Sequence, residues 1–91
     1  MIKVKLVLIE GNLRRILGEK EVLFEISENK ATIKGLLEVI AAKHGDKVLE
    51  VLLKPEISML LNGQYVEFLG GADAKISDGD RVAIIPSITG G

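Results

Sequence analysis

The chain of 91 residues contains no cysteine and no tryptophan, and its aromatic residues are limited to Phe24, Tyr65 and Phe68. Without cysteine the protein can form neither a disulfide nor a thiolate nucleophile. A small domain without disulfides is typical of a reducing compartment, so we expect a cytoplasmic protein. Three aromatic side chains are too few to form a stacking platform for single-stranded nucleic acid.

Strong charge and long apolar segments are also lacking. The net charge is −1 with acidic and basic residues interspersed, so we expect no nucleic-acid partner. The apolar opening, residues 1–9, is too short to span a bilayer, and we expect no membrane association. His44 is the only histidine, which excludes a histidine-based metal cluster. The run Ser77-Asp78-Gly79-Asp80 lacks the further acidic ligands of a calcium loop and is interpreted as a turn, so no metal site is expected.

Apolar periodicity predicts the elements of the first half. Residues 2–9 and 21–26 alternate with period two and indicate an antiparallel pair of strands. The residues between them form a connection with a helical turn that ends at Gly18. Thr32 is a candidate N-cap for a helix whose apolar stripe packs on a sheet. We expect this helix to end at His44-Gly45, with Gly45 in the left-handed cap conformation.

The second half is predicted to contain a short helix and three strands. Asp46 is the candidate cap of the short helix, which Pro55 closes. Asn62-Gly63, between apolar runs at 57–61 and 65–68, is a strong hairpin signal. The last strand covers 81–85 and precedes Pro86, which cannot donate to a ladder.

These elements predict an α+β protein with a mixed β-sheet packed on one main helix. The first and last strands are the most continuously apolar, so we expect them to pair in parallel at the centre of the sheet. That arrangement is a β-grasp, or ubiquitin-like, fold. We predict a single domain over residues 1–91, with 87–91 as a flexible C-terminal tail.

Gly90-Gly91 is the pair most suggestive of function. Two residues without side chains can thread, fully extended, into a narrow channel. A carboxylate at Gly91 could then be adenylated and attacked by a sulfur or amine nucleophile. No internal group is placed for acid–base or nucleophilic catalysis. The chain is therefore interpreted as a carried substrate rather than an enzyme. The alternative interpretation of the glycine pair is a frayed, Gly-rich chain end.

The segment from Phe68 to Gly91 resembles the end of the small subunit of molybdopterin synthase, the MoaD family. The shared features are the Asp78-Gly79-Asp80 turn, an apolar strand, Pro86 and the terminal Gly90-Gly91. The opening strand, the Thr32-led helix and Asn62-Gly63 also occur in the order typical of the family. Gly70-Gly71 is more similar to archaeal relatives of these ubiquitin-like sulfur carriers.

The resemblance implies a function and its partners. An E1-like enzyme would use ATP to adenylate Gly91, with Gly90 as the slender neck behind it. Sulfur transfer would then give a thiocarboxylate. The charged chain would insert its tail into a large synthase subunit and donate sulfur for the dithiolene of molybdopterin. An apolar partner-binding patch maps by position onto Val7, Tyr65 and Ile85, with Pro86 beside the tail. No cofactor is expected on this chain itself.

Three alternatives remain open. Some archaeal relatives, the small archaeal modifier proteins, form isopeptide bonds to lysines of other proteins. Carriers for thiamine or tRNA thiolation use the same fold. A β-grasp binding module with incidental glycines would explain the chain without any acyl chemistry.

Overall fold

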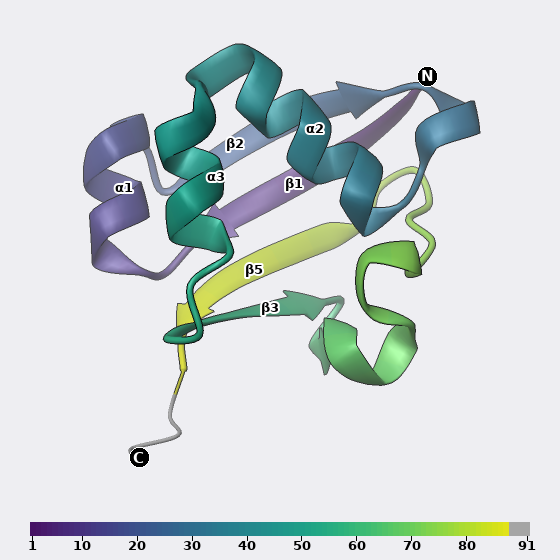
Figure 1. Ribbon diagram of the computed structural model, residues 1–91. Coiled ribbons are helices and arrows are strands. Elements are labelled where there is room, and N and C mark those ends of the chain that lie inside the picture. The colour runs from purple at the N-terminus through teal and green to yellow at the C-terminus, as the bar shows by residue number, and fades with distance from the viewer. Residues whose placement is uncertain (88–91) are drawn as a thin grey trace.

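The computed structural model describes residues 1–87, which form a five-stranded mixed sheet with helices on one face (Figure 1). The strands lie in the order β2-β1-β5-β3-β4. Their bounds are β1 Ile2–Leu8, β2 Glu21–Ile26, β3 Ile57–Leu61, β4 Gln64–Tyr65 and β5 Arg81–Pro86. The α-helices are α1 Gly11–Leu17, α2 Ile33–His44 and α3 Asp46–Leu52. Three short 3₁₀ segments are η1 Glu28–Lys30, η2 Val66–Leu69 and η3 Gly71–Asp73.

The topology confirms the predicted β-grasp. β1 pairs antiparallel with β2 and parallel with β5, and β3 pairs antiparallel with both β5 and β4. β5 is therefore the central strand and follows β1 in direction. The two most continuously apolar strands occupy the middle of the sheet, where burial is greatest.

The core lies between the sheet and α2. Alternate residues of β1 and β5 are fully buried on the helix side, as the period-two pattern predicts. From α2, the side chains of Ile33, Leu36 and Ile40 are at most 2% exposed and cover these strands. Thr32 caps the helix as expected, since its Oγ1 accepts the N–H of Gly35 at 3.1 Å. α3 adds Val48 and Leu52 to the same core.

The connection between β1 and β2 is a full helix rather than a single turn. Glu10 begins α1, because its carboxylate accepts the N–H groups of Asn12 and Leu13 at 3.0 and 2.9 Å. Gly18 ends it with φ 74°, in the left-handed conformation that glycine adopts without strain. Leu13, which is 0% exposed, anchors the helix in the core.

Two predicted helix caps are wrong. Gly45 has positive φ, 93°, but its ψ is 168°, so it is not in the left-handed helical conformation. It still donates its N–H to the carbonyl oxygen of Ala41 and turns the chain directly into α3. Asp46 is the first helical residue of α3 instead of its cap, and its side chain makes no capping hydrogen bond. Gly45 is therefore both the C-cap of α2 and the N-cap of α3.

The predicted strand at 65–68 is also wrong. The hairpin itself is confirmed, since Asn62 and Gly63 have φ values of 50° and 86°, as a tight turn of this kind requires. β4 nevertheless ends at Tyr65, and the chain continues as η2. This turn buries Val66, at 7% exposure, and leaves Phe68 83% exposed.

Candidate functional site: the open sheet face and the end of β5

The candidate site lies where β5 ends. β5 runs through the centre of the sheet and carries the chain to Pro86 and Ser87 (Figure 1). The backbone N–H of Ser87 donates to the carbonyl oxygen of Glu56, so the chain is held at this residue, which the sequence assigned to the tail. Gly90 and Gly91 lie outside the described residues. The last described residue is thus fixed to the rigid sheet only a few residues before the glycine pair.

One face of the sheet, opposite the helices, carries a row of apolar side chains across four strands. Val7 lies opposite Ala83, Ala83 opposite Leu60, and Leu60 opposite Tyr65. Each of these residues alternates with a core residue on its strand, apart from Tyr65 at the short edge strand. The row is partly exposed. We refer to this face as the open face.

Ile85 lies on the same face, one row nearer the end of β5. It is half-buried and pairs with Ser58 of β3. The structure thus brings Val7, Tyr65 and Ile85 onto one surface, as their proposed shared role requires. Pro86 follows the opposite alternation, pairs with Ile57, and is exposed on the helix side of the strand. It belongs to the exit of the chain and not to the open face.

The sequence did not identify Leu60 and Ala83 as members of this row. Period two within residues 57–61 places Leu60 opposite to the core side chains of Met59 and Leu61. The pairing register that aligns Leu60 with Ala83 and Val7 depends on non-local strand contacts, which a single sequence does not reveal. The first strand was predicted to extend to Ile9, but β1 ends at Leu8 and Ile9 is 51% exposed.

Charge on the open face lies at the end away from Ser87 and on β2, where Glu21 is opposite Val7. Lys5 pairs with Arg81 across the parallel strands and with Leu23 on β2. The Nζ of Lys5 lies 3.6 Å from Oε2 of Glu21, an exposed ion pair that contributes little stability. The half of the face near Ile85 is apolar. A partner that binds beside the end of β5 would therefore meet an apolar surface bordered by charge.

The carboxylates of the Ser77–Asp80 turn have structural partners. Asp78 accepts the N–H of Lys3 at 2.7 Å, and Asp80 accepts the N–H of Ser77 at 2.8 Å. Asp80 also accepts from the side-chain amide of Asn62 at 3.0 Å. These bonds fix the start of β5 against β1 and against the turn between β3 and β4. Within residues 1–87, no group of three or more acidic or histidine side chains is arranged to hold a metal ion. No helix in the same range has the length and apolarity needed to cross a membrane.

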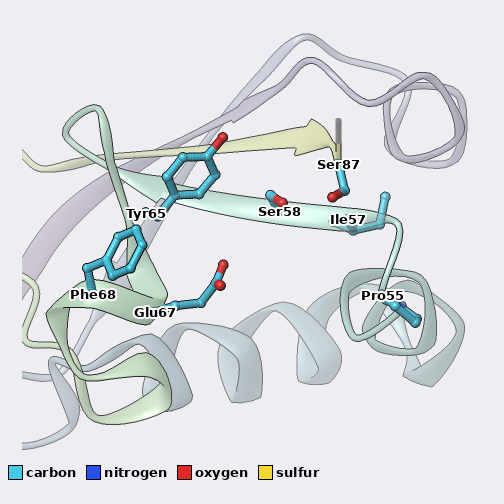
Figure 2. Close-up of a pocket in the computed structure, with 7 residues that line it drawn as sticks. All are labelled: Pro55, Ile57, Ser58, Tyr65, Glu67, Phe68 and Ser87. Carbon is cyan, nitrogen blue, oxygen red and sulfur yellow. The ribbon is translucent and has the colours of Figure 1, made fainter. Parts of the chain in front are cut away.

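A groove of about 650 Å³ runs beside β3 next to the chain exit (Figure 2). Tyr65 and Phe68 form one end of it, with their rings edge to face and 6.2 Å apart. Pro55 and Ile57 form the other end, and Ser87 borders it. The carboxylate of Glu67 points into the space between them in the close-up. Two of the three aromatic residues of the chain therefore line one surface feature.

Comparison with known proteins places this architecture in a family. The model of the ThiS family matches residues 7–91, which include β2 to β5 and the glycine pair. The chain therefore belongs to the ThiS family, a group of small ubiquitin-like sulfur carriers and modifiers.

Individual relatives show both roles in their names. The chain is 31% identical over 72 residues to a proposed sulfur carrier protein of Archaeoglobus fulgidus, covering 74% of this chain and 82% of the relative. It is 28% identical over 82 residues to small archaeal modifier protein 3 of Haloferax volcanii, covering 86% and 88%. Among solved structures, the Amycolatopsis orientalis BexX/CysO complex contains a chain that is 31% identical, with a TM-score of 0.75 and coverage of 97% and 99%.

Proposed function

We propose that this chain is a sulfur carrier whose reactive group is the carboxylate of Gly91. An E1-like enzyme would join this carboxylate to the α-phosphate of ATP and release pyrophosphate. Hydrosulfide would then attack the acyl carbon, displace AMP and leave a thiocarboxylate at Gly91. The charged chain would give its sulfur to a pterin precursor in the large subunit of molybdopterin synthase.

The observation that carries the proposal is the family match, which extends through Gly91. In this chain the diglycine follows β5, which is fixed at the centre of the sheet. Within residues 1–87 the ionisable side chains are spread over the surface or bonded in turns and caps. They form no cluster there that suggests a catalytic site elsewhere than at the end of the chain. The proposal gives the protein no cofactor of its own, because ATP would bind to the activating enzyme.

The open face supplies the binding energy in this proposal. Fixing one backbone residue costs about 1–2 kcal/mol, so a partner that holds an extended tail must gain more than that elsewhere. The apolar row from Val7 to Tyr65, together with Ile85, lies beside the exit of β5. Burial of this surface contributes roughly 25 cal/mol per Å² of apolar area. We therefore propose that the E1-like enzyme and the large synthase subunit bind the open face one after the other.

Intact mass spectrometry tests the proposal. The protein is expressed with its cognate activating enzyme and a sulfur source, and its mass is compared with that of a variant lacking Gly90 and Gly91. Replacement of one oxygen by sulfur, mapped to Gly91 and absent in the truncated variant, is expected. A plain carboxylate at Gly91 in the presence of a competent activating enzyme would refute the carrier role.

The similarity to small archaeal modifier protein 3 favours a second candidate, attachment to lysines. The same adenylate would then be attacked by an amine, directly or through a thioester on a partner, to give an isopeptide bond. Conjugates that carry a Gly91 remnant on lysine in native cells, and that disappear with the two glycines, would support this role. If a strain lacking this protein lost molybdenum-enzyme activity and native cells contained no conjugates, the carrier role would instead be favoured. The thiamine and tRNA routes would each be recognised by loss of their own thiolated product.

A further inference from the structure

The outer edge of β3 is open for much of its length. β4 pairs with β3 only at Leu60 and Leu61, so the stretch from Ile57 to Met59 has no strand partner on that side within residues 1–87. Figure 1 shows β3 on the far side of β5 from β1, and Figure 2 shows the residues that line the groove beside it. An unpaired edge offers main-chain donors and acceptors to an extended segment.

The direction of the free groups follows from the alternation of the strand. The carbonyl oxygen of Glu56 accepts from Ser87, and the N–H of Asn62 donates to Arg81. Residues two apart on a strand direct their main-chain groups to the same side, so those of Ser58 and Leu60 also point toward β5. Ile57 and Met59 therefore direct their main-chain groups outward. The N–H of Ile57 is used by the carbonyl oxygen of Lys54 at 3.0 Å. As far as residue 87, the carbonyl of Ile57 and the N–H of Met59 have no main-chain partner on this edge, and their spacing is the one that an added strand requires.

The side chains around this edge define what the segment carries. Tyr65 and Phe68 provide an apolar wall, and Phe68 is 83% exposed. Pro55 and Ile57 provide the opposite wall. Among residues 1–87, Glu67 is the only charged side chain that lines the groove, and within that range its carboxylate forms no ion pair. Lys54 and Glu56 lie beyond the lining at the Pro55 end.

We propose that the groove beside β3 binds an extended peptide segment of a partner protein by strand addition, with an apolar side chain between the aromatic pair and Pro55 and a lysine or arginine opposite Glu67. Strand addition of this kind draws affinity from main-chain hydrogen bonds and specificity from alternate side chains. The free edge has room for roughly three residues at about 3.3 Å each. Because Ser87 borders the groove, the bound segment lies next to the chain exit.

This recognition mode goes beyond the carrier role and does not depend on it. The open face and the groove adjoin, because Tyr65 belongs to both and Ser58, the partner of Ile85, also lines the groove. Binding of a peptide in the groove requires no sulfur on Gly91, so the two proposals are tested by separate measurements. If no peptide bound in the groove, the mass spectrometry test for a thiocarboxylate at Gly91 would still stand as a separate result.

The test is a titration of the full ¹⁵N-labelled chain with two short blocked peptides, one of alternating valine and lysine and one of alternating valine and glutamate. The lysine peptide is expected to shift the amide signals of Ile57–Met59 and Tyr65–Phe68 saturably, and the glutamate peptide to bind more weakly. Glu67→Lys should weaken the lysine peptide by about three- to tenfold and strengthen the glutamate peptide. Phe68→Ala should weaken both peptides by about fivefold or more.

Glu25→Lys, a charge reversal at the exposed edge of β2, is the matched control and should leave both affinities unchanged. Four results would overturn the proposal. These are the absence of saturable shifts at β3, shifts confined to β2, equal effects of Glu25→Lys and Glu67→Lys, and shifts of the β3 amides on dilution without peptide. The last result would assign the groove to a second copy of the chain.

Discussion

Gly35 of α2 lies directly against the carbonyl oxygen of Lys30. A Cβ atom at residue 35 would be 1.8 Å from that oxygen, far inside contact distance. The oxygen is itself held by the N–H of Thr32 at 2.8 Å, and the Gly35 N–H is bound by the Thr32 hydroxyl at 3.1 Å. The first turn of α2 and the preceding 3₁₀ turn can approach this closely only because residue 35 has no side chain.

Gly35→Ala is therefore expected to lower the free energy of unfolding by about 2 kcal/mol, although alanine is the better helix former by about 1 kcal/mol. Chemical denaturation with a circular dichroism readout measures the change. Gly11→Ala is the matched control, because a Cβ there meets nothing within 4 Å and the residue is already helical. A stabilised Gly35→Ala variant would show that the turn before α2 shifts freely.

Ile85→Asp should weaken binding of the activating enzyme by tenfold or more while the domain stays folded. The side chain lies on the open face beside the end of β5, where the proposed partner contact would bury it. Isothermal titration measures the affinity, and circular dichroism checks the fold. The neighbouring change Ile84→Asp is the contrast, since Ile84 is 0% exposed and a buried charge there should unfold the protein. Unfolding by both variants would place Ile85 in the core.

Glu10→Ala should lower the free energy of unfolding by about 1–2 kcal/mol, because it removes the acceptor for two N–H groups at the start of α1. Glu10 is 7% exposed, so water cannot easily replace the lost bonds. Thermal denaturation monitors the effect. Glu19→Ala, at an exposed position just after the same helix, should have almost none. Equal effects of the two changes would indicate that the loss of a negative charge, and not the loss of the cap, lowers the free energy of unfolding.

Removal of Gly90 and Gly91 should abolish both the thiocarboxylate and any lysine conjugates, yet leave the midpoint of thermal unfolding unchanged. Among residues 1–87 the buried side chains all lie between Ile2 and Ile84, so we expect the core to form without the glycines. Calorimetry on the purified truncated chain measures stability, and activation is followed by pyrophosphate release. A large drop in stability would mean that the glycines contribute to the folded domain.

Much of the fold could be predicted because local patterns and global packing agree. The alternation in residues 2–8 and 81–86, the Thr32 cap and the Asn62-Gly63 turn each have one structural solution, and together they define the β-grasp. The errors arose where tertiary contact overrides the local signal. Phe68 continues an apparent strand in the sequence, but burial of Val66 turns the chain into η2. Glu10 was not recognised as a cap because glutamate seldom serves in that position.

The candidate site was predictable only in part. The spacing of Val7 and Ile85 within their strands indicates which face each occupies, and the structure places them together with Tyr65. Leu60 and Ala83 were missed because their alignment depends on the register of strands far apart in the sequence. The groove beside β3 was missed for a related reason, since the early end of β4 at Tyr65 both opens the edge and brings Phe68 next to Tyr65.

The central position of β5 has a mechanical consequence. A protein that grips the end of the chain pulls along the axis of β5, whose hydrogen bonds to β1 and β3 lie across that axis on both sides. Such a load shears two ladders at once instead of opening them one bond at a time. We therefore expect the domain to resist traction on the end of its chain better than a domain in which an edge strand carries that load.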